Sequence, residues 1–301
     1  MFLLNLFVLP LIISILSFNI LVPKLDEFIC SIPNDRSSHS KEIATGGGII
    51  FAIISTLFGI FSNNLIFMYC LPLSVIGLID DKFEIKALWR YLIQLLVCTF
   101  LVTNIDLQLS FPLLLIAIFT GTAIINFTNF MDGIDGLVVG CMLVIFATAS
   151  LQFHSLLPLI ASLLVYLNLN WSPARLFMGD SGSTYLGGVF FALLIQYNNW
   201  LDSLAFLLIS APLIGDAFLC VIIRYINGRN VFKAHRSHLY QRLVRAGISH
   251  SKVSTFYILA TMFLAVSFIL GGIKFLLLAF SIEIIVVYYI NKYYAINFID
   301  S

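Results

Sequence analysis

Charged residues are scarce in this 301-residue sequence. Asp, Glu, Lys and Arg together make up 10% of it, whereas hydrophobic residues make up 60%, and the mean hydropathy is +1.03. A soluble domain carries about 25% charged residues, so the composition excludes an ordinary soluble domain and predicts an integral membrane protein. The formal net charge is +1, but the positions of the charges are more informative than their sum. We expect no nucleic-acid partner.

Paired cysteine motifs are missing as well. The five Cys occur singly, at positions 30, 70, 98, 141 and 220, and no two form a Cys-X-X-Cys pair. Such spacing is not typical of a disulfide framework or a zinc site, so we interpret the Cys as small apolar packing residues. There is also no internal repeat, low-complexity tract or stretch long enough for a separate soluble core. We therefore expect one polytopic membrane domain over residues 1–301.

Long apolar runs fill most of the chain. A transmembrane helix needs about 20 mostly apolar residues to cross the hydrocarbon core of a bilayer. The apolar runs of this chain are about that long. They predict an all-α integral membrane protein, a polytopic bundle of about 10–11 transmembrane helices. The expected segments are 2–22, 46–62, 64–79, 88–103, 111–126, 137–152, 155–170, 184–198, 201–224, 253–270 and 272–291.

The positions of the basic residues predict how these segments are oriented. If the first segment runs from outside to inside, every Lys and Arg except Lys274 falls on the cytoplasmic side. Basic residues are enriched on that side of membrane proteins. The connections on the opposite side are short and chemically plain. We therefore expect the active site to lie in the cytoplasmic loops.

Two adjacent acids follow the third apolar segment, in the stretch IDDKFEIKALWR. Asp80 and Asp81 lie at the membrane boundary, and Arg90 lies on the helix expected to follow. Adjacent carboxylates repel each other unless a cation or a proton lies between them. A solvated helix end explains an isolated Asp pair equally well.

The stretch NFTNFMDGIDGL follows the fifth apolar segment. Asn126, Asn129 and Asp132 are spaced i, i+3 and i+6, which predicts one flank of a helix end. Carboxylate and amide oxygens are the ligands that Mg²⁺ accepts. A polar turn is the alternative, but a turn needs only one Asp-Gly pair and this stretch has two. The pattern therefore favours a functional site.

A third polar stretch, LFMGDSGSTYLGG, places Asp180 directly before the eighth apolar segment. Backbone N–H groups at the start of a helix attract phosphate, whereas an Asp there repels it unless a metal ion lies between them. The pattern therefore suggests a metal–phosphate complex. Taken alone, an ordinary helix cap is the better interpretation of this motif.

The fourth polar stretch, KAHRSHLYQR, gathers cationic donors that suit a pyrophosphate, because Arg binds phosphate oxygens bidentately. His235, Arg236 and His238 are its candidates. Anchoring of the cytoplasmic side explains Lys and Arg but not two His. The two His could ligate zinc, but no Cys or further His lies close enough to complete a tetrahedral site.

One acid lies within an apolar segment. The stretch APLIGDAF places Pro212 and Asp216 inside the ninth segment. A carboxylate at that depth should face the protein interior or a polar cavity, and Pro makes a kink or break plausible there. Asp216 also supports an alternative function, a multi-span transporter that uses it and the loop carboxylates as an ion path. A transporter predicts acids within several segments, whereas only Asp216 and Glu283 qualify here.

Four motifs, DDKFEIKALWRYLIQ, NFTNFMDGIDGL, LFMGDSGSTYLGG and AHRSHLYQR, occur in an order that resembles the polyprenyl-phosphate N-acetylhexosamine-1-phosphate transferases. The resemblance covers nearly the whole chain. The HRSHLYQ form is most similar to the subgroup that initiates O-antigen or capsule synthesis. The muramoyl-pentapeptide transferases have a corresponding loop that is richer in His.

The resemblance implies transfer of an N-acetylhexosamine 1-phosphate from a UDP-sugar to undecaprenyl phosphate, at the cytoplasmic face of the bacterial inner membrane. It implies Mg²⁺, or Mn²⁺ in its place, with Asp180 and Asn129 as metal ligands. Asp80, Asp81 and Asp180 match catalytic positions, and the roles of the first two, carrier binding or deprotonation, are left open. The residues expected to bind substrate are Arg90, Asn126, Asp132, Asp135, His235, Arg236 and His238.

Some properties stay open at this level. The sugar could be of the GlcNAc, GalNAc, FucNAc or QuiNAc type. The partners implied are the UDP-sugar, the carrier lipid and the surrounding membrane lipid. A homodimer is compatible with the resemblance, and the sequence does not fix the oligomeric state.

Overall fold

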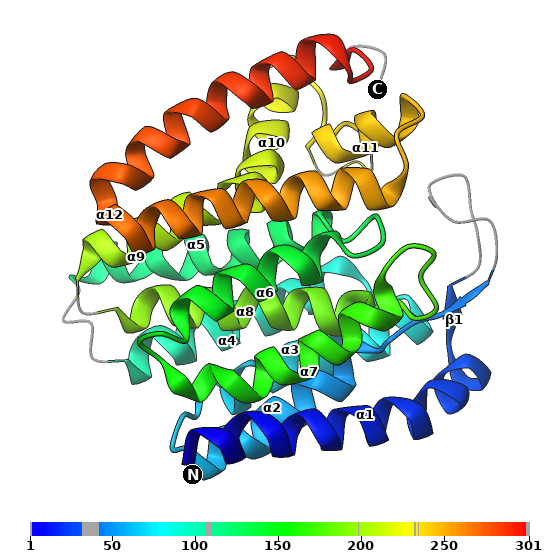
Figure 1. Ribbon diagram of the computed structural model, residues 1–301. Coiled ribbons are helices and arrows are strands. Elements are labelled where there is room, and N and C mark those ends of the chain that lie inside the picture. Colours follow the sequence, from blue (N-terminus) through cyan, green and yellow to red (C-terminus); the bar gives the residue numbers. More distant parts are fainter. Residues whose placement is uncertain are drawn as a thin grey trace.

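Helices make up most of the computed structural model, which describes residues 2–31, 42–105, 110–197, 199–231, 233 and 235–298 (Figure 1). The helices are α1 (Phe2–Phe28), α2 (Gly48–Phe61), α3 (Ile66–Phe83), α4 (Ala87–Asn104), α5 (Phe111–Phe130), α6 (Leu137–Ala149), η1 (His154–Leu156), α7 (Leu157–Asn170), α8 (Gly179–Gln196), α9 (Trp200–Ile209), η2 (Ala211–Gly215), α10 (Asp216–Ile226), α11 (Leu239–Arg245) and α12 (His250–Tyr293). Two short strands, β1 (Cys30–Ser31) and β2 (Ile43–Ala44), complete the described elements.

Each of the eleven apolar segments contains helix. The ninth is broken into α9 and α10, which meet at an angle of 66° around the π-helical turn η2 that contains Pro212. The last two segments form α12, whose helical geometry is interrupted at Gly271 and Gly272. The all-α polytopic fold and the break near Asp216 are therefore confirmed, and α11 is a helix that hydropathy did not predict.

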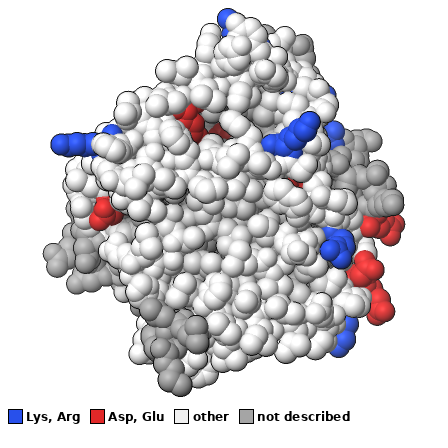
Figure 2. Space-filling view, in the orientation of Figure 1, with Lys and Arg blue, Asp and Glu red and all other residues white. Residues whose placement is uncertain are grey.

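The outer helices carry the apolar surface. By length and composition, four described helices could span a membrane, α1, α4, α5 and α12, or five if α9 and α10 form one broken span. Leu16 of α1 and Leu278 of α12 are 56% and 65% exposed, as suits side chains that face lipid. Figure 2 shows one face with few charges across its middle, most of those in view lying at one edge. The number of membrane-spanning helices, about 10–11, remains a prediction.

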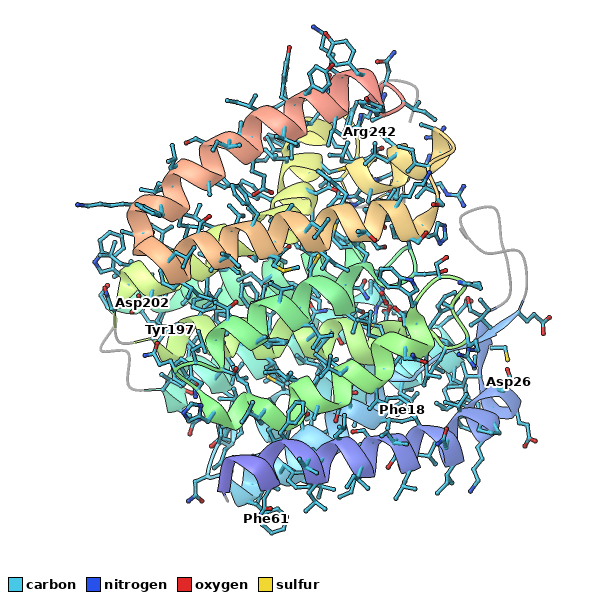
Figure 3. The ribbon with its side chains drawn as sticks, in the orientation of Figure 1. Phe18, Asp26, Phe61, Tyr197, Asp202 and Arg242 are labelled. Carbon is cyan, nitrogen blue, oxygen red and sulfur yellow. The ribbon has the colours of Figure 1, made fainter. Side chains whose placement is uncertain are left out.

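The inner helices are shorter or more polar, and α8 is the most enclosed of them. Its residues from Ser181 to Leu194 are buried, and it packs against α2, α3 and α5. Its first turn lies where α3 and α5 end, at the end of the bundle that also holds α11 (Figure 1). We call this end the site end. Asp202, in the first turn of α9, lies at the opposite end (Figure 3).

Three helices extend beyond the segments that hydropathy marks. α3 continues to Phe83, α5 continues to Phe130, and α8 begins at Gly179. Hydropathy reports only the apolar part of a helix, and these helices continue into polar sequence. As a result, the acids of α3 and α8 and the Asn residues of α5 stand on helix ends, whereas Asp132 and Asp135 lie in the loop between α5 and α6.

Small residues bring these helix ends together. Gly77 of α3 faces the backbone of Asp180, with which a Cβ would collide, and Gly48 of α2 faces Gly182 of α8 in the same way. Glycine at a helix contact lets two backbones approach closely. The start of α8 is thereby placed against the end of α3, where two further acids lie.

A short sheet fixes the approach to α8. β1 and β2 pair antiparallel, with Cys30 opposite Ala44. The backbone of Ala44 also accepts a hydrogen bond from the N–H of Phe177 at 2.8 Å, and the N–H of Gly47 donates to the carbonyl of Phe177 at 3.0 Å. The segment before α2 is therefore tied to the turn that begins α8.

The Gly77 contact leads to a test of the packing. We expect Gly77→Leu to lower the unfolding temperature of the detergent-purified protein, because overpacking costs about 1–3 kcal/mol and the obstacle here is backbone. Gly215→Ala is the control, since a Cβ at Gly215 meets its nearest neighbour at 3.6 Å, an ordinary contact. An unchanged melting curve for Gly77→Leu would contradict the close approach of α3 and α8.

Candidate active site

One guanidinium links acids from two helices. Arg90, in the first turn of α4, donates through Nη1 to Oδ2 of Asp80 and, at 2.7 Å, to Oδ2 of Asp180. The other oxygen of Asp80 accepts the N–H of Ile85 at 2.6 Å. Charge-assisted hydrogen bonds of this kind are the strong ones. Arg90 therefore joins the end of α3 to the start of α8 and offsets part of their negative charge.

Asp81 keeps one oxygen without a partner. Its Oδ1 accepts the N–H of Asp180 at 3.0 Å, whereas its buried Oδ2 has no hydrogen-bond partner among the described residues. Gly179 makes room for this carboxylate, because a Cβ there would collide with it, and its φ of +66° also favours glycine. A buried carboxylate oxygen without a donor is costly, and a bound cation would relieve that cost.

The two Asn of the predicted motif have different partners. Asn129, in the last turn of α5, donates through Nδ2 to Oδ1 of Asp180 at 2.8 Å and to Ser183 Oγ at 3.0 Å. Asn126 instead donates to Gln94 Oε1 of α4 at 2.7 Å. The structure therefore brings Asn129 and Asp180 together as predicted, whereas Asn126 links α5 to α4. Gln94 was not predicted, and its only signal was an amide within an apolar segment.

A polar cavity of about 290 Å³ lies at these helix ends. Burial, followed by the nearby Asp180, Asp81 and Asp135, raises the pKa of Asp132 well above its usual range. The converging oxygens suit a hard cation such as Mg²⁺, which prefers oxygen ligands. The cavity is lined by Ser31, Thr45, Asp81, Asn129, Asp132, Gly133, Ile134, Asp135, Asn170, Phe177, Gly179, Asp180 and His250.

Asp135 is fixed by contacts from two other parts of the chain. Its Oδ2 lies 3.4 Å from Nδ1 of His250 and accepts the N–H of Ala174 at 3.2 Å. Burial alone would raise the pKa of Asp135, but His250 and the Ala174 N–H outweigh it and lower that pKa. Asp135 thus shapes the wall of the polar cavity. His250 is a site residue that the sequence does not predict, because a single His at the start of a helix does not by itself indicate a functional site.

A larger cavity of about 900 Å³ lies between α3, α4, α5 and α10. Its polar lining includes Arg90, Lys233, His235 and His238. Asn129 and Asp180 line this cavity and the polar cavity alike. The apolar lining includes Leu73, Ile76, Leu88, Phe127, Phe130 and Val221. Arg236 is not among the described residues that line either cavity.

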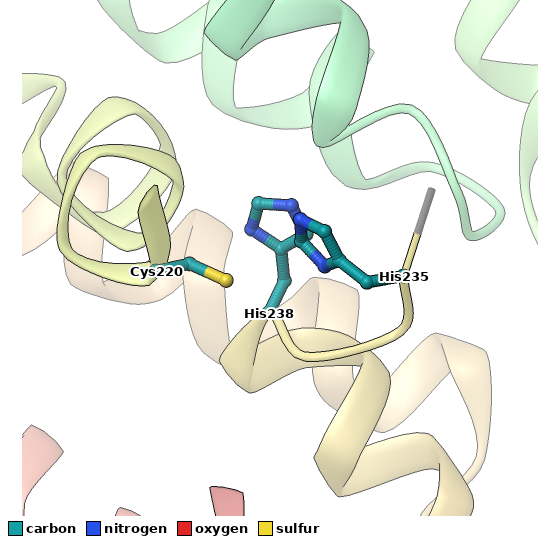
Figure 4. A group of neighbouring side chains, drawn as sticks. All are labelled: Cys220, His235 and His238. Atoms are coloured by element: carbon teal, nitrogen blue, oxygen red, sulfur yellow. The ribbon is translucent and has the colours of Figure 1, made fainter. Parts of the chain in front are cut away.

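The two His of the fourth motif are neutral near pH 7. Burial, with His238 and Arg224 nearby, lowers the pKa of His235 to about 4. Burial also lowers the pKa of His238, although Asp216 acts in the opposite direction. The sequence predicts cationic donors at these His, whereas the structure makes them neutral donors or acceptors. It also brings Cys220 of α10 beside them (Figure 4), which sequence spacing did not show.

Asp216 holds the start of α11. Its Oδ1 accepts the N–H of Leu239 at 2.9 Å, and its Oδ2 accepts the N–H of Tyr240 at 3.3 Å and the hydroxyl of Tyr257 at 2.7 Å. The hydroxyl of Tyr240 in turn donates to the carbonyl of Phe130 at 2.9 Å, at the end of α5. Asp216 is therefore a positioning residue for the loop that carries His235 and His238. With three donors bound, it is poorly suited to an ion path.

Comparison with known proteins shows which families of sequence the chain is similar to. Residues 63–198 match the model of glycosyl transferase family 4. A probable undecaprenyl-phosphate N-acetylglucosaminyl 1-phosphate transferase of Bacillus subtilis is 26% identical, over 93% of this chain and 89% of its own length. A phospho-N-acetylmuramoyl-pentapeptide-transferase of Staphylococcus haemolyticus is 28% identical, over 83% of this chain and 93% of its own. An undecaprenyl-phosphate alpha-N-acetylglucosaminyl 1-phosphate transferase of Thermotoga maritima is 30% identical, over 52% of each chain.

The site and these comparisons define a polytopic membrane protein with an acid-rich centre between helix ends. Residues 63–198 match glycosyl transferase family 4, and the resemblance of the chain to the polyprenyl-phosphate N-acetylhexosamine-1-phosphate transferases is confirmed. Both kinds of relative, the N-acetylglucosaminyl and the muramoyl-pentapeptide transferases, match it. Membership of the O-antigen or capsule subgroup therefore stays a prediction.

The contacts of Asp216 can be tested without an activity assay. We expect Asp216→Asn to speed tryptic cleavage within residues 227–249, because an amide nitrogen would face one of the backbone N–H donors and leave it unpaired. Asp202→Asn, at the opposite end of the bundle, is the control. Cleavage at the unchanged rate in Asp216→Asn would show that Asp216 does not hold α11.

Proposed function

We propose that this protein transfers an N-acetylhexosamine 1-phosphate from a UDP-sugar to undecaprenyl phosphate and releases UMP. The observation that carries the proposal is that Asn129 and Asp180 line both a polar cavity and a larger, mainly apolar one. A water-soluble nucleotide sugar and a lipid phosphate need such a pair of neighbouring cavities. The names of the relatives, which act on undecaprenyl phosphate, support the same reaction.

The donor set fits Mg²⁺, or Mn²⁺ in its place. Asp180 would hold the ion together with Asp81, whose Oδ2 has no partner among the described residues. Asn129 now turns its Nδ2 to Asp180, and rotation of its amide by half a turn would offer Oδ1 as a further ligand. When bound, the ion would supply positive charge to the diphosphate, as metal ions do in phosphoryl transfer.

The carrier is already a competent nucleophile. A phosphate monoester has a second pKa of about 6 and is largely a dianion at pH 7. One of its oxygens would attack the β-phosphorus of the donor, forming a new P–O–P link. The bond from that phosphorus to the bridging oxygen would break, and UMP would leave with the electron pair. This step needs no proton removed by the enzyme.

The task of the protein is then to bring two anions together and align them. Arg90 lies beside Asp180 in the larger cavity, where its guanidinium would hold the carrier phosphate. His235 and His238, on the loop that Asp216 fixes, also line the larger cavity and would donate hydrogen bonds to the donor diphosphate where it reaches that cavity. Asp80 is already bound by Arg90 and Ile85, so its part is to position Arg90. Preorganised donors of this kind usually supply the largest share of catalysis.

The cellular setting follows from the same proposal. The site end would face the cytoplasm, where UDP-sugars are made, and the bundle would lie in the bacterial inner membrane. The product would begin an O-antigen, capsule or other envelope polysaccharide, which the HRSHLYQ motif supports. Among the sugars left open, GlcNAc has additional support from the names of the relatives.

The metal and Asp180 can be tested together. We expect the purified protein in lipid to exchange labelled UMP into UDP-GlcNAc only with both undecaprenyl phosphate and Mg²⁺, and EDTA to abolish the exchange. Asp180→Asn should lower the rate by about 100-fold or more, the effect of removing a group that stabilises transition-state charge. Asp202→Asn should keep the full rate.

Two results would contradict this assignment. Full exchange in a correctly inserted Asp180→Asn variant would remove Asp180 from the reaction. Solute uptake into sealed vesicles, without formation of a lipid-linked sugar, would favour the alternative of a transporter.

The donor can be identified by offering UDP-sugars singly. We expect UDP-GlcNAc to give a lipid diphosphate-HexNAc that mass analysis detects, with smaller amounts of product from UDP-GalNAc and the 6-deoxy donors. Mass separates HexNAc from 6-deoxy-HexNAc by one oxygen atom, and separate incubations resolve GlcNAc from GalNAc. Product from a 6-deoxy donor alone would contradict the GlcNAc assignment.

A further inference from the structure

Three potential metal ligands converge beside the larger cavity. Cys220 comes from α10, and His235 and His238 come from the loop before α11. One ligand atom from each, a thiol sulfur and two imidazole nitrogens, lie within 4.8 Å of one another. Figure 4 shows the thiol of Cys220 directed toward the two rings. The break between α9 and α10 and the folding of α11 onto Asp216 bring Cys220 to two His that lie 15 and 18 positions further along the chain.

The cluster is enclosed and has unused bonding capacity. Cys220 and His238 are each 3% exposed, and Nδ1 of His238 is buried without a hydrogen-bond partner in the described part of the chain. Nδ1 of His235 accepts the N–H of Ser237 at 3.3 Å, which places the proton of the neutral ring on Nε2; to bind a metal, the ring would release this long bond and offer Nδ1. A buried polar atom with no partner is unusual in a folded protein. A ligand that accepts electron pairs from nitrogen and sulfur would satisfy it.

The chemistry of this cluster differs from that of the acid-rich centre. Thiolate and imidazole suit Zn²⁺ and related transition metals, whereas carboxylate and amide oxygens suit Mg²⁺. Three protein ligands leave the fourth position of a tetrahedral zinc ion for water or a phosphate oxygen.

We propose that Cys220, His235 and His238 bind Zn²⁺, and that this ion inhibits the enzyme. On binding, the thiol releases its proton to water, and sulfur and two ring nitrogens form bonds to the metal. Zinc would hold both rings toward Cys220 and withdraw them from the donor diphosphate. The binding site stands on the geometry alone, whereas the inhibition rests on the function proposed above.

Metal binding is tested first, with Co²⁺ as a spectroscopic substitute for Zn²⁺. We expect the detergent-purified protein to bind one Co²⁺ with thiolate-to-metal charge-transfer absorption, and Zn²⁺ but not excess Mg²⁺ to remove it. Cys220→Ser should lose this absorption. Cys30→Ser should keep it, which is the matched control because Cys30 is the more exposed thiol. No charge-transfer absorption in the unaltered protein, or the same absorption in Cys220→Ser, would overturn the site.

Inhibition is tested on the same proteins. Cys220→Ser should keep the zinc-free rate of UMP exchange, while the Zn²⁺ concentration that halves it should rise at least about tenfold, since even outer-shell changes at metal sites weaken binding by that much. Equal zinc sensitivity in Cys220→Ser and the unaltered protein would overturn the inhibitory role. Where Cys220→Ser has a lowered melting temperature, Cys220→Ala, which suits a helix, replaces it.

Asp180→Asn separates the two proposals. This variant should lose UMP exchange and still show the Co²⁺–thiolate absorption. If no protein preparation exchanges UMP while Co²⁺ binding depends on Cys220, the metal site stands and the transferase proposal fails.

Discussion

Repulsion among carboxylates at the start of α8 is the constraint on which the rest of the structure depends. Asp80, Asp81 and Asp180 meet there because Gly77 lets α3 lie directly against the backbone of α8. Arg90 offsets part of the charge, and Asn129 orients Asp180 from α5. No described ion pair joins a Lys or Arg to Asp81 or to the neighbouring Asp132, and burial raises the pKa of Asp132. An acid cluster of this kind is stable only with a cation or retained protons, so the packing that creates the site also sets its affinity for a metal.

Much of this arrangement could be predicted from the sequence. Hydropathy located the eleven helical segments, because an apolar run long enough for a bilayer is a strong signal. The distribution of Lys and Arg predicted that the polar motifs share one end of the bundle, and Asp81, Asn129 and Asp180 do meet there. Motif order then indicated the family, which the comparisons confirm. The helix ends were misplaced by four or five residues, since hydropathy does not register the polar turns that continue a helix.

Contacts between helices could not be predicted from the sequence. The pairing of Asn126 with Gln94 depends on how α4 and α5 face each other, which spacing along either helix does not determine. The break in the ninth segment could be predicted from Pro212. Its consequence could not: Asp216 accepts hydrogen bonds from the backbone at the start of α11. The sequence shows no third zinc ligand close to His235 and His238. Only the folded chain brings Cys220 to these two residues. His250 likewise meets Asp135 from a distant part of the sequence.

Among the described residues, Asn129 and Asp180 alone line both cavities, and this bears on the order of events in a catalytic cycle. For the transfer proposed, the soluble donor and the lipid acceptor would arrive through different cavities and meet over these two side chains. Neither has to leave before the other enters, so both are present at once and the sugar phosphate passes directly between them. Initial rates measured against one substrate at several concentrations of the other should then give intersecting lines, the signature of a ternary complex, and inversion at phosphorus would accompany the single displacement.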